Sequence, residues 1–165
     1  MGIRNSCKAI IIRDNKILLN KNQNSIGDMC YGLPNGAIYY DLPGGGQNQY
    51  ETLEDTVVRE CAEESGYTVS VEKLVAIFEE ISTNEKFRAA YEHYAHKVHF
   101  VFLCKLSNAP MQALLAERDL DMVQSEWIAL DAIHNVALYP LMLKSHLTRL
   151  LKTNTPLYLG AEIVP

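Results

Sequence analysis

The sequence predicts an α/β protein in which helices lie on both faces of a mixed β-sheet, forming an α/β/α sandwich. Three observations lead to this prediction. Segments of strand character precede one amphipathic helical segment, further strand segments follow it, and a leucine-rich helix comes near the C-terminal end. The 165 residues are 48% hydrophobic, which is enough for a substantial core. We therefore expect one domain over residues 1–165.

The N-terminal segment is expected to form a β-hairpin. Residues 6–13 have the composition of a strand, Asp and Asn at 14–15 suit a turn, and residues 16–20 continue as a second strand. A polar loop over residues 22–35 leads to a short strand over residues 37–42. That strand delivers the chain into a turn of one proline and three glycines.

A helix with recognisable ends follows the glycines. Thr52 and Asp55 form a variant of the capping box, and Glu54 and Asp55 suit the positive N-terminal end of the helix dipole. Gly66 is a natural residue for the left-handed position that ends a helix. The helix should therefore lie between Thr52 and Gly66.

The second half of the chain continues with strands and a final helix. Residues 69–81 and 97–106 alternate as strands do, and residues 122–130 form a shorter strand with the only tryptophan. Pro140 is expected at about the first position of the last helix, which carries leucines at 141, 143, 147, 150 and 151. The apolar tail at 156–165 should either pack onto its own domain or pair with a second subunit.

Three carboxylates gather on one stripe of the first helix. At about 100° per residue, Glu60, Glu63 and Glu64 share a face, while apolar residues gather on the other side. Carboxylates at these spacings can hold one or more magnesium ions against a pyrophosphate. On their own, the three glutamates fit an ordinary acidic surface helix equally well.

The surrounding residues favour the metal site, because nine positions fit a single pattern with fixed spacing, Gly-x5-Glu-x7-Arg-Glu-U-x-Glu-Glu-x-Gly-U, where U is bulky and apolar. The pattern is filled by Gly45, Glu51, Arg59, Glu60, Cys61, Glu63, Glu64, Gly66 and Tyr67. This segment resembles the Nudix box, the signature of the Nudix hydrolases. Cys61 and Tyr67 stand where aliphatic residues are usual, and both can pack in a core.

The resemblance implies the Nudix fold and a metal-dependent pyrophosphatase that cleaves a nucleoside diphosphate linked to another moiety, by attack of water on phosphorus. The expected metal is Mg²⁺, with Mn²⁺ as an alternative. Glu60 and Glu64 are the first choice as metal ligands, with Glu63 in support and the carbonyl of Gly44 as an extra ligand. Arg59 would orient the glutamates by ion pairing.

Two further roles stay open. Glu51 would hold either Arg59 or a metal-bound water. The general base would be Glu60 or a carboxylate of the acidic loop that carries Glu117, Asp119 and Asp121. The sequence does not choose between them.

Substrate contacts are expected around the glycine turn. Gly45 and Gly46 leave room for close approach of a phosphate. One of Tyr39 and Tyr40 should point into the cleft, since neighbouring residues of a strand face opposite sides, and it would stack on a base or pack. His96, or its neighbour Lys97, would touch a phosphate or act as a base, although buried or surface structural roles are common for histidine.

The nature of the substrate is less determined than the reaction. The chain has no proline about fifteen residues beyond the box, which weakens an ADP-ribose assignment within the family. The signatures of diadenosine polyphosphate and coenzyme A hydrolases are also missing. We expect a small nucleotide-type substrate, because the net charge of −5 and pI near 5.5 do not suit binding of a nucleic acid polymer.

The spacing of the cysteines and the hydropathy of the chain indicate the cellular compartment. The cysteines at 7, 30, 61 and 104 form no CxxC pair, which is typical of reduced residues in a cytoplasmic protein. The longest apolar runs are too short for a membrane span, so we expect a soluble protein without membrane contact. A homodimer is slightly favoured over a monomer.

Two other functions remain as alternatives. A noncatalytic Nudix-like nucleotide-binding module would normally lack some charged positions of the box, and here the box is intact. A Nudix-fold isoprenoid diphosphate isomerase would need a catalytic cysteine and glutamate in a different context.

Overall fold

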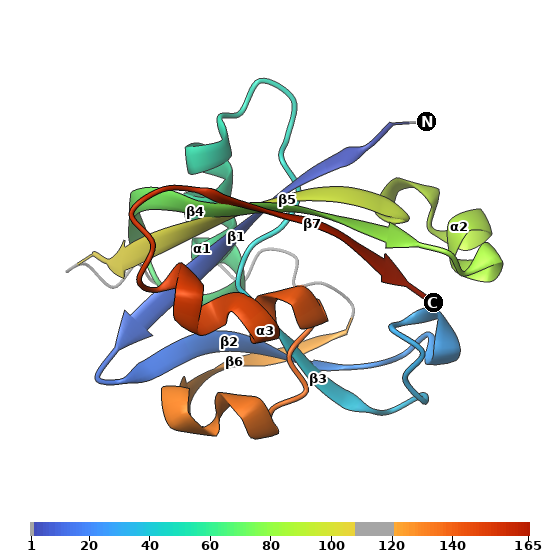
Figure 1. Cartoon of the computed structure of the whole chain (residues 1–165). Coiled ribbons are helices and arrows are strands. Elements are labelled where there is room, and N and C mark those ends of the chain that lie inside the picture. The colour runs from blue at the N-terminus through green and yellow to red at the C-terminus, as the bar shows by residue number, and fades with distance from the viewer. Residues whose placement is uncertain (1, 108–120) are drawn as a thin grey trace.

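A computed structural model describes residues 2–107 and 121–165 of the chain (Figure 1). Seven strands and three α-helices account for most of these residues, joined by short 3₁₀ turns. In chain order the elements are β1 (Arg4–Arg13), β2 (Lys16–Gln23), β3 (Ile38–Asp41), α1 (Leu53–Ser65), β4 (Val69–Ser82), α2 (Glu85–Ala90), β5 (His96–Leu106), β6 (Met122–Ala129), α3 (Leu141–Leu150) and β7 (Leu157–Val164).

The strands form one mixed sheet in the order β3-β2-β1-β5-β4-β7, with β6 paired to β2 outside this path. Strand β1 runs parallel to β5, β5 antiparallel to β4, and β4 parallel to β7. The β1–β2 hairpin turns at Asp14 and Asn15, which have φ angles of 51° and 59°. Asp and Asn tolerate such positive φ better than most residues, as the turn requires.

Alternation along β1 explains why helices cover both faces of the sheet. Cys7, Ala9 and Ile11 pack in one buried cluster with Val57 and Cys61 of α1. Ile10 faces the other way and packs in a second cluster that contains the leucines of α3. In Figure 1, α3 crosses the near side of the sheet and α1 lies behind it. The α/β/α prediction is confirmed.

Several elements differ in extent from the prediction. Strands β1 and β2 are longer, and α2 was not predicted, because its six residues, EKFRAA, form less than two turns and have no apolar stripe. Pro140 is the N-cap of α3 and not its first helical residue. Within the described ranges, no helix is long and apolar enough to cross a membrane.

The C-terminal tail packs onto its own domain. It forms β7 and pairs with β4 of the same chain, with Ala76 opposite Leu157 and Ser82 opposite Val164. Leu157 and Leu159 pack against the core cluster of α3. Strand β7 is therefore part of this sheet.

Candidate active site

The N-cap and the C-terminal glycine of helix α1 fix where its charged residues lie. Thr52 caps the helix, since its hydroxyl accepts a hydrogen bond of 3.1 Å from the backbone N–H of Asp55. Gly66 ends the helix at a φ of 73°. Val57 and Cys61 are fully buried against the sheet, so the acidic stripe lies beside the glycine turn.

Arg59 is the centre of an ion-pair network on this helix. Its guanidinium donates to both carboxylate oxygens of Glu51, at 2.7 and 2.9 Å, and to Glu60 at 2.8 Å and Glu63 at 2.9 Å. It also donates to the carbonyl of Gly46 at 3.1 Å. The forked geometry of arginine suits several acceptors at once, so Arg59 fixes the directions of three carboxylates.

Glu64 points inward. Its side chain accepts hydrogen bonds of 2.7 Å from Asn20 Nδ2 and 2.7 Å from the backbone N–H of Gly44. The residue is only 8% exposed. Burial raises the pKa of Glu64 to about 8, although the charge of Lys8 partly opposes the shift. The carboxylate is thus held in place but lacks full compensation for its charge.

The glycine turn fits tightly between β1 and α1. Gly44 has a φ of +129°, and a Cβ there would clash with the carbonyl of Cys7. A Cβ on Gly45 would lie 2.5 Å from the carboxylate of Glu60. Glycine is therefore required at position 44, whereas a side chain at position 45 would displace the carboxylate of Glu60, which lies directly against the backbone.

Lys8 of β1 reaches the same turn. Its ammonium group donates to the carbonyl of Gly44 at 2.5 Å, to the carbonyl of Leu42 at 3.0 Å and to Asp41 at 3.0 Å. Lys8 is 8% exposed, and its charge lies close enough to Glu64 to affect the pKa of that residue. The sequence analysis did not select Lys8, because a single lysine in a strand carries no motif.

The donor set suits a divalent cation, although the side chains are not gathered around one. Among the described residues, no group of three or more His, Cys, Asp or Glu side chains is arranged to hold a metal ion. Arg59 holds Glu60 and Glu63, while Lys8 lies on the Gly44 carbonyl. The available donors are nevertheless all oxygens, as Mg²⁺ prefers. Burial also raises the pKa of Glu60, partly opposed by Arg59, so an added positive charge would be favoured there.

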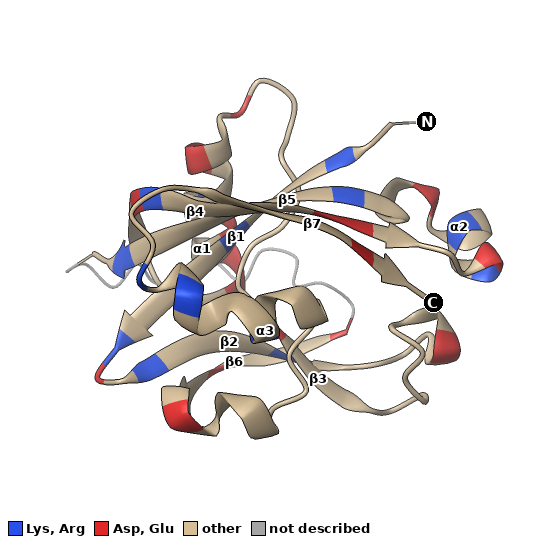
Figure 2. Ribbon diagram, viewed as in Figure 1, with Lys and Arg blue, Asp and Glu red and all other residues tan. Residues whose placement is uncertain are grey.

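A cleft of about 400 Å³ opens beside these residues. Glu60 and the glycine turn form one side of it, and the polar ends of β1, β4 and β5 form another. Figure 2 shows basic segments of β1 and β5 next to acidic segments of β4 and β7, at the end of the sheet towards α2. Aromatic side chains at the remaining sides include Tyr31, Tyr39, Tyr91 and Tyr94.

A second charged cluster lies inside the cleft. Lys97 of β5 forms an ion pair with Glu80 of β4, and Nε2 of His99 lies 3.5 Å from the other oxygen of Glu80. The hydroxyl of Tyr31 donates to that same oxygen at 3.2 Å. Burial alone would raise the pKa of Glu80, but Lys97 and His99 together hold it well below its usual range.

Two residues expected to contact substrate lie elsewhere. His96 is on the opposite face of β5, where its Nε2 lies 3.1 Å from Glu79, and it does not line the cleft. Its neighbour Lys97 lines the cleft instead, as strand alternation requires. Tyr39 also lines the cleft, whereas the hydroxyl of Tyr40 donates to Glu126 at 3.1 Å outside it.

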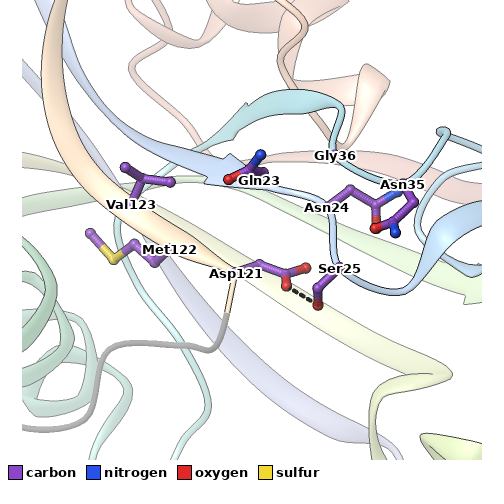
Figure 3. A pocket seen from close by; sticks show the side chains of 8 residues that line it. All are labelled: Gln23, Asn24, Ser25, Asn35, Gly36, Asp121, Met122 and Val123. Atoms are coloured by element: carbon purple, nitrogen blue, oxygen red, sulfur yellow. Dashed lines mark hydrogen bonds between the residues drawn. The ribbon is translucent and has the colours of Figure 1, made fainter.

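Of the three acidic loop residues proposed from the sequence, Asp121 lies within the described residues. Glu117 and Asp119 lie outside the described residues. Asp121 lines the cleft and accepts a hydrogen bond from Ser25. Figure 3 shows this pair among the residues that line a neighbouring cavity of about 440 Å³, at the end of β2, the start of β6 and the segment with Asn35 and Gly36.

Comparison with known proteins gives one family and one related sequence. Residues 4–147 match the model of the NUDIX domain. An ADP-ribose pyrophosphatase of Methanocaldococcus jannaschii is 38% identical over 69 residues. The match covers 42% of this chain and only 36% of that protein.

Solved structures resemble the whole fold. A NUDIX hydrolase from Nitrosomonas europaea has a TM-score of 0.63 at 19% identity, covering 89% of this chain and 90% of its own. A MutT NUDIX hydrolase from Burkholderia pseudomallei has a TM-score of 0.52 at 28% identity, covering 79% and 86%. An ADP-ribose pyrophosphatase from Streptococcus suis 89-1591 has a TM-score of 0.59 at 19% identity, covering 98% and 100%.

Proposed function

This chain belongs to the Nudix family, and on that premise we propose that it hydrolyses the pyrophosphate bond of a nucleoside diphosphate linked to another moiety. One observation carries the proposal: Arg59 holds Glu51, Glu60 and Glu63 beside the buried Glu64, at a glycine turn that borders the cleft. Carboxylates beside an open cleft suit a cation and a diphosphate together.

The residues that would hold the metal are Glu60 and Glu64, with Glu63 and the carbonyl of Gly44 in support. A divalent cation bound there, Mg²⁺ or Mn²⁺, would neutralise charge on the leaving phosphate and lower the pKa of a coordinated water. Lys8 donates to the Gly44 carbonyl and to Asp41, so its positive charge lies beside the turn where the phosphates would bind.

The remaining residues act by position. Glu51 and Arg59 would keep the carboxylate of Glu60 in one orientation through the Arg59–Glu51 pair. Glu60 would accept a proton from the attacking water, since its carboxylate borders the cleft beside the glycine turn. Asp121, which lines the same cleft, is the alternative base. Gly45, Gly46 and Tyr39 would border the substrate.

The isomerase alternative gains no support from the cysteines. Cys30 lines the cleft, but burial raises its pKa to about 11, so its thiol is a weak nucleophile at neutral pH. Cys7, Cys61 and Cys104 pack in the core under α1. A noncatalytic nucleotide-binding module would not require the intact ion-pair network of Arg59.

Activity measurements on a substrate panel test the proposal. Purified protein is incubated with nucleoside diphosphate sugars, ADP-ribose, dinucleoside polyphosphates and nucleoside triphosphates, with and without Mg²⁺, and the products are separated by chromatography. We expect at least one class of substrate to be cleaved at its pyrophosphate bond, and only when the metal is present. No cleavage of any class with Mg²⁺ or Mn²⁺ would favour the binding module.

We also propose a homodimer, formed at the open edge of β7. This strand is at one end of the sheet order, and its residues Tyr158 and Ile163 are 69% and 59% exposed to solvent. Pairing of two such edges across a twofold axis would cover both side chains. Light scattering on the full chain and on an Ile163→Lys variant tests this proposal. A wild-type mass of one chain would end it.

A further inference from the structure

The polar residues in the cleft belong to a sheet face that is apolar elsewhere. Along β5, Val101 packs in the core cluster of α3, while His99 and Lys97 follow on the same face. On β4, Phe78 is in that core and Glu80 follows it on the same face. The register places Lys97 opposite Glu80 on one side and opposite Arg4 on the other. The face changes from apolar to charged where the cleft begins.

His99 is the least satisfied residue of this face. It is 2% exposed, and its ring is stacked on Phe78 at 4.7 Å. Neither ring nitrogen makes a hydrogen bond among the residues that the structure describes, and the contact of Nε2 with Glu80 is 3.5 Å long. A buried polar side chain without a partner costs free energy unless something else satisfies it. His99 lines the cleft, so a ligand could supply the partner.

The Glu80–Lys97 pair defines what kind of ligand fits. Lys97 has N–H donors and Glu80 has acceptor oxygens, so the pair offers a donor next to an acceptor. A phosphate would suit Lys97 but would meet the carboxylate of Glu80, and a metal ion would meet the ammonium group. A neutral group with both an acceptor and an N–H donor avoids both conflicts.

Aromatic side chains make the cleft suitable for a flat group. Tyr91 is 36% exposed and Tyr94 is 45% exposed, and both line the cleft on the segment that follows α2. Across the cleft, Tyr31 and Tyr39 lie edge to face at 6.1 Å. Planar heterocycles stack on aromatic rings of this kind, and here Arg4 already lies over the Tyr94 ring at 4.6 Å and Tyr31 is stacked on Tyr139 at 4.5 Å.

We propose that Glu80, Lys97 and His99 bind the hydrogen-bonding edge of the substrate's nucleobase, with the aromatic side chains against its faces. This inference rests on the proposed function, because it assigns the base of the proposed substrate to the side of the cleft formed by β4 and β5. It makes Glu80 and Lys97 determinants of substrate selection. The reacting phosphates would lie at the glycine turn, where Lys8 and Glu60 are found.

Product binding tests the inference without any need for hydrolysis. Isothermal titration calorimetry compares AMP, GMP, CMP and UMP with ribose 5-phosphate, which lacks a base. We expect at least one nucleotide to bind the wild-type chain about tenfold more tightly than ribose 5-phosphate. The double variant Glu80→Gln/Lys97→Met should lose that difference and still bind ribose 5-phosphate as the wild type does.

A matched control is available on the same two strands. Lys105 and Glu72 form an exposed ion pair between β5 and β4, so Glu72→Gln/Lys105→Met makes the same chemical changes outside the cleft. This control should bind nucleotides normally. If the cleft double variant does not fold by circular dichroism, Glu80→Gln and His99→Phe are measured singly and should each weaken nucleotide binding.

Two results would overturn the inference. One is a wild-type protein that binds every nucleotide no better than ribose 5-phosphate, and the other is a folded cleft variant with wild-type nucleotide affinity. Failure of the proposed function is a separate result. A wild-type chain that binds a nucleotide more tightly than ribose 5-phosphate but cleaves no substrate with Mg²⁺ refutes only the reaction. Glu64→Gln should lose hydrolysis and keep the difference in affinity between nucleotide and ribose 5-phosphate.

Discussion

Two charged clusters face the same cleft, and they handle buried charge in opposite ways. On α1, the buried Glu64 has amide hydrogen bonds, and its pKa is raised to about 8. On the sheet, the equally buried Glu80 has the ammonium group of Lys97 beside it, and its pKa is lowered. The positive charge of Lys8 only partly offsets the burial of Glu64, whereas Lys97 and His99 more than offset the burial of Glu80.

The difference indicates which part of the cleft needs a cation from outside. Desolvation disfavours a charged carboxylate unless an opposite charge compensates it. Lys97 compensates Glu80 within the chain, whereas Arg59 is occupied by Glu51, Glu60 and Glu63. The helix cluster therefore suits a divalent metal, and the sheet cluster suits a neutral polar ligand. Each prediction below tests one side of this contrast.

The largest effect is expected for Glu64→Gln. This substitution keeps the shape of the side chain and removes the charge that would bind the metal. We expect the rate of pyrophosphate cleavage to fall by about 10²-fold or more, which corresponds to several kcal/mol of lost transition-state stabilisation. The measurement is kcat on the best substrate of the panel, at saturating Mg²⁺.

Stability is the control for that variant. Because burial opposes ionisation of Glu64, the Gln variant should be at least as stable as the wild type when no metal is present. Thermal unfolding in EDTA checks this. A folded Glu64→Gln protein with near-normal turnover would remove Glu64 from the metal site.

The second prediction concerns the self-compensated cluster. Lys97→Ala leaves Glu80 buried without its partner, which should lower the free energy of unfolding by about 3 to 5 kcal/mol. Lys97→Met combined with Glu80→Gln should cost much less, because no unpaired charge remains. Urea denaturation of the three proteins provides the comparison. Equal losses in the single and double variants would mean that the charges contribute little.

The two clusters also differ in how far the sequence could predict them. The contacts of Arg59 with Glu60 and Glu63 join residues one and four positions apart on a helix, and helical geometry is regular. The caps at Thr52 and Gly66 set that helix in register with the glycines. Both features can be inferred from local spacing, which explains why the helix cluster was predicted.

The sheet cluster depends on strand pairing, which has no local signature. Glu80 and Lys97 meet because β4 and β5 pair in one register, and that register includes irregularities at Val71/Lys73 and Leu74/Ala76. Alternation could separate the faces of His96 and Lys97, but it could not say which face borders a cleft. The inward position of Lys8 likewise follows from the pairing of β1 with β5.

The third prediction uses the metal itself. Mg²⁺ should raise the melting temperature by binding only the folded chain, and the gain would be about 2.7 kcal/mol at a concentration of 100 times Kd. Glu60→Ala/Glu64→Ala should remove that gain. The double variant of the sheet cluster, Glu80→Gln/Lys97→Met, should keep it, since the sheet cluster needs no external cation. An equal rise in wild type and Glu60→Ala/Glu64→Ala would place the ion elsewhere.

The smallest effect is expected for Glu51→Gln. Arg59 compensates the charge of Glu51, and the contribution of this ion pair to the stability of the fold can be measured as a function of pH. The ion-pairing hydrogen bond with Arg59 lowers the pKa of Glu51 from 4.5 to about 2. A carboxyl with a lowered pKa in the folded state stabilises the fold above its unfolded pKa, and this contribution is lost as the pH falls from about 4.5 towards 2.

Glu51→Gln should therefore be less stable than the wild type near neutral pH, and the difference should narrow as the pH falls to about 3. Thermal unfolding in EDTA at several pH values measures this difference without interference from metal. Glu54→Gln is a suitable control, because Glu54 lies in the first turn of the same helix, outside the Arg59 network. A difference between wild type and Glu51→Gln that does not change with pH would show that Glu51 contributes through packing and not through its charge.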